Sequence, residues 1–362
     1  MVTSGFTTVL YLFDVANAID LDAVRKRLGD RASTAMLGDK APGPLRVKYI
    51  QPPVIVDGAG VGVPEIEGFH IRVKFYEYGV VSLMLRRPFA GPWTELVELG
   101  QTLIENETLE TRAHEACQQI VGACAGAFKD ARSSFLSEDY LVFTVTPEDP
   151  PQPADALLAA HTGDIAQLVR GERQTLSAQE RDEVLRHRLS YLASDLVVPS
   201  WNGAFVYDSE AGVPGALEIL EFANSQLLQF RYYDQRLDRE LTRIYARLQT
   251  TRWYEPWIGR RYTAAARELH ALFIDVNELT DRTENALKLV GDVYAARLLG
   301  LAAARLGLGA WKDAVRDKLK TLDDIYRFAV DQTAMDRGEI LEAAIVFILV
   351  LELVLFFMGI MT

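Results

Sequence analysis

Cysteine and histidine are scarce in this chain, which has two cysteines and five histidines among 362 residues. Cys117 and Cys124 are seven positions apart on a predicted helix, hence about 10.5 Å apart and beyond disulfide reach. The scarcity excludes a disulfide-stabilised fold and suits a reducing compartment. Together with His114 the cysteines match no common zinc pattern, so we interpret all three as core-facing residues.

An excess of basic charge is also missing, because the formal net charge is −12. Affinity for nucleic acids comes mainly from Lys and Arg side chains that neutralise phosphates, so we expect no direct nucleic-acid binding. The sequence contains no G-x-S-x-G, Walker A, H-E-x-x-H or Rossmann fingerprint. We therefore expect no enzymatic activity and no cofactor.

A long apolar run is present in the segment Ile340–Met361, which contains no proline and only two carboxylates, Glu342 and Glu352. About twenty helical residues span the roughly 30 Å hydrocarbon core of a bilayer, so the run is predicted to be a transmembrane tail anchor. The alternative is an apolar helix buried in an oligomer, which the carboxylate of Glu352 near the middle of the run favours.

The flanks of this run predict its orientation. Lys318, Lys320, Arg327 and Arg337 precede it and no basic residue follows it. By the positive-inside rule, the long part before the anchor is expected in the cytoplasm. Residues 1–10 agree, because they lack the basic region and cleavage site of a signal peptide.

Residues 1–212 are predicted to form a mixed α+β domain. An apolar hairpin is expected over 70–85, turning at Tyr78-Gly79, and a proline-interrupted edge strand over 48–56. A proline-rich insertion near 147–153 is followed by further strand character in 188–208, around a Trp201-Asn202-Gly203 turn. One α+β domain accounts for these strands better than two small domains do.

Residues 213–339 change to long helical patterns with apolar residues at alternating spacings of three and four. Two such patterns, over 220–244 and 262–293, predict a long antiparallel helical hairpin of coiled-coil type, followed by a third helix that leads into the 340–361 anchor. The predicted fold class is therefore α+β, with the helical hairpin and the transmembrane helix after the N-terminal domain.

Several segments resemble one known family. They are Phe-Tyr-Glu-Tyr-Gly-Val-Val at 75–81, Trp-Asn-Gly-Ala-Phe-Val-Tyr-Asp at 201–208, the stretch from Leu220 to Asp234, Asn-Ala-Leu-Lys-Leu-Val-Gly-Asp at 285–292, and the glutamates of the tail. This combination resembles the "required for meiotic nuclear division" family, also called the Sad1-interacting-factor or YagE-type family. The resemblance implies a domain of unknown function, with mitochondrial relatives that are membrane-associated, oligomeric supporters of organellar translation.

The candidate polar site lies in the 201–234 block. On a helix, Glu221, Asn224 and Arg231 share a face, beside an apolar stripe that carries Asp234. A polar pocket would combine them with Trp201, Asn202 and Tyr207. The structural interpretation is stronger: an ion pair of Glu221 with Arg231 or a similar buried donor, Asn224 bonded to backbone, and Asp234 as the salt-bridge partner of Arg231.

The resulting functional hypothesis is a membrane-anchored cytoplasmic scaffold that binds the lipid bilayer, a partner protein and further copies of itself. Glu342 and Glu352 lie about 80° apart around the tail helix. Both are expected to face the other helices of an oligomer in the membrane. One alternative is support of translation by ribosome binding at the membrane. Another is a metal-dependent enzyme that uses carboxylates near 218–234, such as Glu218 and Glu221.

Overall fold

The computed structural model describes residues 2–34, 51–66, 68–104, 106–148, 151–250, 273–277, 279 and 293–357. The chain divides into two compact units. Unit 1 comprises Met1–Tyr232 and Asp281–Trp311, and unit 2 comprises Tyr233–Thr280 and Lys312–Thr362. The structure is therefore a mixed α+β protein with an N-terminal sheet unit and C-terminal helices, as the sequence predicts in outline.

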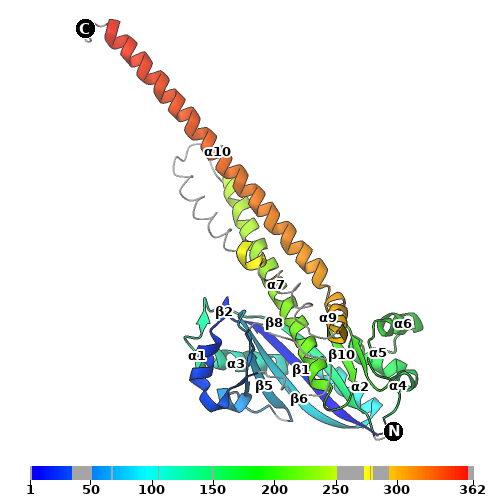
Figure 1. Cartoon of the computed structure of the whole chain (residues 1–362). Helices are drawn as coiled ribbons and strands as arrows, with labels where there is room; N and C mark the ends of the chain where they lie inside the picture. Colours follow the sequence, from blue (N-terminus) through cyan, green and yellow to red (C-terminus); the bar gives the residue numbers. More distant parts are fainter. Residues whose placement is uncertain are drawn as a thin grey trace. The chain divides into compact units, whose positions relative to one another are not determined.

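Unit 1 is built on an eight-stranded sheet in the order β3-β4-β5-β6-β1-β8-β10-β9 (Figure 1). All neighbouring strands are antiparallel except the parallel pair β8 and β10. The strands are β1 (Val2–Asp14), β3 (Ser33–Thr34), β4 (Val54–Asp57), β5 (His70–Phe75), β6 (Val80–Pro92), β8 (Leu136–Thr146), β9 (Leu196–Pro199) and β10 (Gly203–Tyr207). A separate two-stranded sheet pairs β2 (Ala18–Ile19) with β7 (Phe128–Lys129).

The predicted hairpin is confirmed, since β5 and β6 pair antiparallel with Phe75 opposite Val81. Gly79 in its turn has a φ of +86°, a conformation that residues with a side chain rarely adopt. The predicted edge strand over 48–56 was wrong in its position. β4 is shorter and is paired on both sides, and Pro52 and Pro53 precede it, so that they remove no hydrogen-bond donor from the sheet.

One face of the sheet carries the apolar core. Val9, Tyr11 and Phe13 alternate along β1 and point into this core, as the period of two in a strand requires. Short helices contribute the opposing apolar side chains. They are α1 (Leu21–Leu28), α2 (Trp93–Leu103), α3 (Glu107–Ala123), α4 (Ala154–Ala160), α5 (Thr162–Arg170) and α6 (Ala178–Arg186).

The opposite face of the sheet contacts the first half of α7 (Val213–Thr250), which Figure 1 draws in green across the strands. Residues 215–230 of this helix are buried on all sides. This face of the sheet includes polar residues, among them Asp14, Lys74 and Ser82, and all three are buried. Buried polar groups need partners, so this interface is where the chemistry of unit 1 concentrates.

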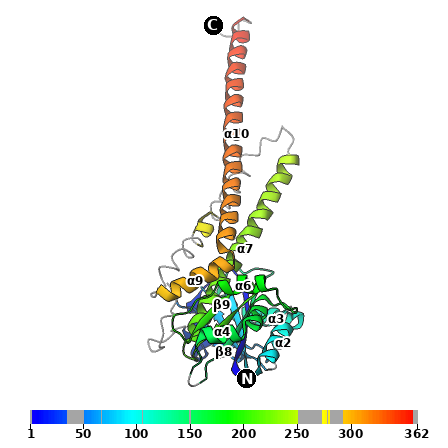
Figure 2. The same ribbon diagram turned by 90° about the vertical axis from the view of Figure 1, so that its right-hand side faces the viewer.

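The predicted strand character of 188–208 is confirmed in β9 and β10 but not around 189–192. Residues 151–186 form α4, α5 and α6, and of the predicted strand around 189–192 only a single bridge between Leu189 and Val197 forms. The carboxylate of Asp195 accepts hydrogen bonds from the backbone N–H groups of Tyr191 and Leu192 and so holds this segment in a turn. Helix α9 (Val293–Arg305) lies beside the edge strand β9 (Figure 2).

Unit 2 contains the second half of α7 and most of α10 (Leu308–Phe357). Within it, the ammonium of Lys318 lies 2.7 Å from carboxylate oxygens of both Asp234 and Asp238. The second helix of the predicted hairpin falls almost entirely outside the described residues. The side chains of Glu342 and Glu352 also fall outside them, although the α10 backbone at both positions is helical.

Within the described part of the chain, no single helix has both the length and the apolar composition that crossing a membrane requires. A bent pair, Val293–Arg305 with Leu308–Ile325, meets these two requirements only when its members are taken together.

Candidate functional site

The most strongly charged buried site of unit 1 joins β5 to α7. The ammonium of Lys74 lies 2.9 Å from Oε2 of Glu218 and 2.5 Å from Oε2 of Glu221. The side chains are 5%, 9% and 0% exposed respectively, so almost no solvent screens these charges. With two carboxylates around one ammonium, the fully ionised group carries an excess negative charge.

Charge and burial shift the pKa of Lys74 in opposite directions. Burial lowers the pKa of its ammonium, but Coulombic attraction and hydrogen bonds from Glu218 and Glu221 outweigh burial and raise that pKa above its ordinary value. Lys74 is therefore a permanent cation at neutral pH. Because both carboxylates already hold this cation, their geometry favours an ion pair over the metal site of the alternative hypothesis.

A second polar group joins the end of β1 to α7. Asp14 receives a two-pronged hydrogen bond from the guanidinium of Arg132 and a further bond of 2.9 Å from the side-chain amide of Gln229. Arg132 also donates to the hydroxyl of Tyr232 at 2.7 Å and stacks on its ring, 3.6 Å from the centroid. This forked geometry fixes the loop before β8 against both β1 and α7.

The polar partners of α7 follow a helical repeat. Glu218, Glu221, Ser225 and Gln229 are spaced by three, four and four residues and therefore lie on one face. Ser225 is bonded to the hydroxyl of Tyr78 at 2.7 Å and donates its own proton to the carbonyl of Phe222. The face of α7 that packs on the sheet thus carries a polar stripe that matches the polar side chains of the sheet.

The structure brings together only part of the predicted 201–234 pocket. Asn224 donates from its amide to the carbonyl of Leu220. The predicted pairing of Arg231 with Asp234 or Glu221 was wrong. Arg231 pairs instead with Glu138 of β8. Asp234 pairs instead with Lys318.

The three predicted pocket residues that precede α7 lie away from Glu221. They are Trp201, Asn202 and Tyr207. Tyr207 belongs to the apolar core face and donates to the carbonyl of Gln152 at 2.8 Å. Trp201 is 46% exposed. Asn202 donates at 3.4 Å to the carbonyl of Arg170. These residues therefore do not join Glu221 in one pocket.

The sequence-based reading missed Lys74, Asp14 and Arg132. The local signal is weak, because Lys74 follows the alternation of polar and apolar residues in His-Ile-Arg-Val-Lys-Phe at 70–75 that is typical of a half-exposed strand. A buried strand position occupied by lysine demands a carboxylate partner. The partner itself is 144 residues away and cannot be identified by local spacing.

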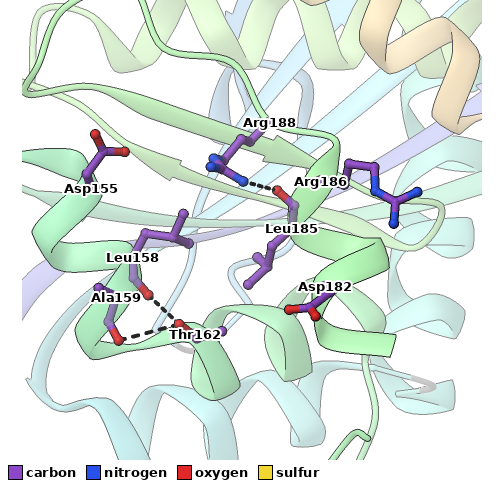
Figure 3. A pocket seen from close by; sticks show the side chains of 8 residues that line it. All are labelled: Asp155, Leu158, Ala159, Thr162, Asp182, Leu185, Arg186 and Arg188. Carbon is purple, nitrogen blue, oxygen red and sulfur yellow. Dashed lines mark hydrogen bonds between the residues drawn. The ribbon is translucent and has the colours of Figure 1, made fainter. Parts of the chain in front are cut away.

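A shallow surface pocket of about 430 Å³ lies between α4, α5 and α6 (Figure 3). The side chains of Arg188 and Thr162 donate to the carbonyls of Leu185 and Leu158, and Asp155 and Arg186 lie on opposite sides of it. Its charged groups do not converge on one point, so the α7 interface remains the better candidate site. The lining residues are Asp155, Leu158, Ala159, Thr162, Asp182, Leu185, Arg186 and Arg188.

Fold and site together define an α+β protein whose mixed sheet has an apolar helical layer on one face and a charged helix on the other. The chain belongs to the family described as "Uncharacterized protein MJ0711, N-terminal domain", whose model matches residues 4–213. Uncharacterized protein MJ0711 of Methanocaldococcus jannaschii is 22% identical over 289 residues, which cover 80% of this chain and 82% of that protein. No solved structure matches the chain.

Proposed function

We propose that the protein is a membrane-anchored scaffold, in which the tail of α10 inserts into the bilayer and the sheet unit engages a partner on the cytoplasmic side. The observation that supports this proposal is a run of six consecutive apolar side chains, Ile345–Val350, each between 50% and 67% exposed. Soluble monomers rarely expose a continuous apolar surface of this kind.

The distribution of these side chains favours a bilayer over a one-sided groove. At 100° per residue, six consecutive helical positions sample the whole circumference of α10. A partner protein that covered one stripe would leave the other positions in water, whereas hydrocarbon surrounds all of them. The apolar composition of 340–361 in the sequence extends this character to the length of a membrane span.

The test is removal of residues 340–362 followed by fractionation and carbonate washing of membranes. We expect the full chain in the washed membrane and the truncated chain in the supernatant. As a matched control, replacing 340–361 by an unrelated leucine- and alanine-rich stretch of equal length is expected to restore membrane binding. A truncated chain that stays in washed membranes contradicts the anchor.

The resemblance to the Sad1-interacting-factor family adds a second candidate role, support of translation at the membrane. Its support is the family likeness alone, and the net charge of −12 disfavours direct contact with ribosomal RNA. The scaffold proposal is therefore preferred, with homo-oligomerisation through the tail and the helical region as its structural basis.

A further inference from the structure

Four side chains form a contiguous group, here called the Arg86 cluster, on the sheet face that contacts α7: Phe6, Thr8, Arg86 and Thr144. Thr8 lies opposite Arg86 in the β1–β6 pair, and Phe6 lies opposite Thr144 in the β1–β8 pair. Directly opposed residues of antiparallel strands point to the same face, with Cβ atoms about 4.5 to 5.5 Å apart. Arg86 and Ser82, on the same strand, share the face of Lys74 by the same alternation.

The cluster contains polar atoms that find no hydrogen-bond partner among the described residues. They are Nε of Arg86 and the hydroxyl oxygens of Thr8 and Thr144, and all three are hidden from solvent. Thr8 and Thr144 are each only 1% exposed. Because nearly all buried polar groups in proteins are bonded, three adjacent exceptions indicate a site for a ligand that accepts hydrogen bonds.

The charge at this site is the positive charge of Arg86. Arg86 packs its guanidinium 3.6 Å from the centroid of the Phe6 ring, and no salt bridge to Arg86 or Arg72 occurs in the part of the chain that the structure describes. Burial and the positive charge of Arg72 lower the pKa of Arg86, and the negative charge of Glu210 opposes them in part. An anion would relieve this unfavourable environment.

One end of the group reaches the protein surface. Arg72, Ser4 and Pro88 are exposed, and Phe6 and Arg86 are partly exposed, whereas Thr8 is buried. An anion that enters past Arg72 would therefore meet the guanidinium first and the hydroxyl groups behind it. Arginine and hydroxyl donors contributed by three different strands suit an acceptor with several oxygens, such as a phosphate group.

We propose that the Arg86 cluster binds the phosphate group of a small molecule, with the Arg86 guanidinium and the Thr8 and Thr144 hydroxyls as donors. Inorganic phosphate and a phosphomonoester share this chemistry. The site belongs to unit 1 and is independent of the proposed membrane anchor.

The experiment is isothermal titration of the full chain in mild detergent with inorganic phosphate and, separately, with glycerol 3-phosphate, against sodium chloride at matched ionic strength. We expect saturable binding of at least one phosphate compound, and the stronger of the two identifies a free ion or an ester as the ligand. Arg86→Met is expected to weaken binding by about tenfold or more, as the loss of a charged hydrogen bond predicts.

Two kinds of variant separate binding from folding. Arg87→Met removes the same charge at the next residue, whose side chain is exposed and points to the other face, and is expected to leave the affinity unchanged. Thr8→Val and Thr144→Val keep side-chain volume and remove the unpartnered hydroxyl. We expect each to weaken phosphate binding severalfold while the melting temperature of the unliganded protein stays equal or rises.

Three results would overturn the proposal. The first is the absence of saturable heat beyond the chloride control. The second is an equal loss of affinity in Arg87→Met, which would indicate general attraction to positive charge. The third is a lower melting temperature of the unliganded Thr→Val variants with unchanged phosphate affinity, which would show that the hydroxyl groups are bonded within the protein.

Discussion

The ammonium of Lys74 and a carboxylate oxygen of Glu221 lie 2.5 Å apart although 147 positions separate the two residues in the chain. This ion pair joins an interior strand of the sheet, β5, to a helix that begins after the last strand of the sheet. Removing a single partner of a fully buried ion pair leaves the other charge without compensation, which is strongly unfavourable. The pair therefore makes the docking of α7 a condition for a stable sheet unit.

Replacing Lys74 with methionine is expected to lower the free energy of unfolding by about 3 to 5 kcal/mol, because Glu218 and Glu221 would remain buried without a cation. Urea unfolding followed by circular dichroism measures this change. Lys26→Met, at an exposed position of α1, is the matched control and should change stability by no more than about 0.5 kcal/mol. A loss below about 1 kcal/mol in Lys74→Met would show that water reaches the carboxylates.

Removing all three charges together tests whether uncompensated carboxylates cause the loss of stability in Lys74→Met. The triple variant Lys74→Met, Glu218→Leu and Glu221→Leu should recover most of the stability that Lys74→Met loses, because apolar residues of similar volume often replace buried ion pairs at little cost. A triple variant that is less stable than Lys74→Met would indicate that packing, rather than uncompensated charge, dominates.

Between neutral and alkaline pH, the stability supplied by Lys74 should fall only in strongly alkaline solution. Its folded-state pKa is raised above the ordinary 10.5. A cation with a raised folded-state pKa stabilises fully below the unfolded pKa, and this contribution disappears as the pH rises through the folded value. The difference in unfolding free energy between wild type and Lys74→Met should therefore stay constant from about pH 7 to 9 and shrink above 10.5. A steady decline from pH 7 would contradict the raised pKa.

Gly79→Ala is expected to destabilise the β5–β6 hairpin by more than about 1 kcal/mol. A Cβ at this position would lie 1.8 Å from the carbonyl oxygen of Ala16, and the φ of +86° disfavours any side chain. Gly122→Ala in α3 is the control, since a Cβ there meets no atom within 4 Å and helix propensity predicts a gain of up to about 1 kcal/mol. Thermal melts of both variants compare the two effects, and equal stabilities would contradict the close contact.

Replacing Glu352 with leucine is expected to preserve membrane attachment and to weaken self-association. A carboxylate at mid-depth in a bilayer is tolerated where it faces other helices and forms hydrogen bonds with them. Light scattering in mild detergent tests this proposal by comparing the oligomer size of the wild type with that of Glu352→Leu. Glu342→Leu is the control near the interface and should change the assembly less. An undiminished Glu352→Leu oligomer would place self-association in the soluble helices.

Local patterns in the sequence predicted much of unit 1. Helix caps are local in the same sense: Asp20 accepts hydrogen bonds from the backbone N–H groups of Asp22 and Ala23 at the start of α1, and Ser177 accepts one from that of Glu180 at the start of α6. The Tyr78-Gly79 turn identified the hairpin because its conformation depends on the glycine itself. The extent of the strand around 189–192 could not be predicted, because the carboxylate of Asp195 holds that backbone in a turn.

By itself, the sequence determined the features that depend on neighbouring residues: the α+β class, the hairpin and the apolar composition of 340–361. Only the tertiary structure decided the partners of the charged residues. It paired Lys74 with Glu218 and Glu221, Arg231 with Glu138, and Asp14 with Arg132. The physical reason is that an ion pair needs proximity in space and exclusion of water, and both arise here from strand order and helix docking, which periodicity along the chain does not encode.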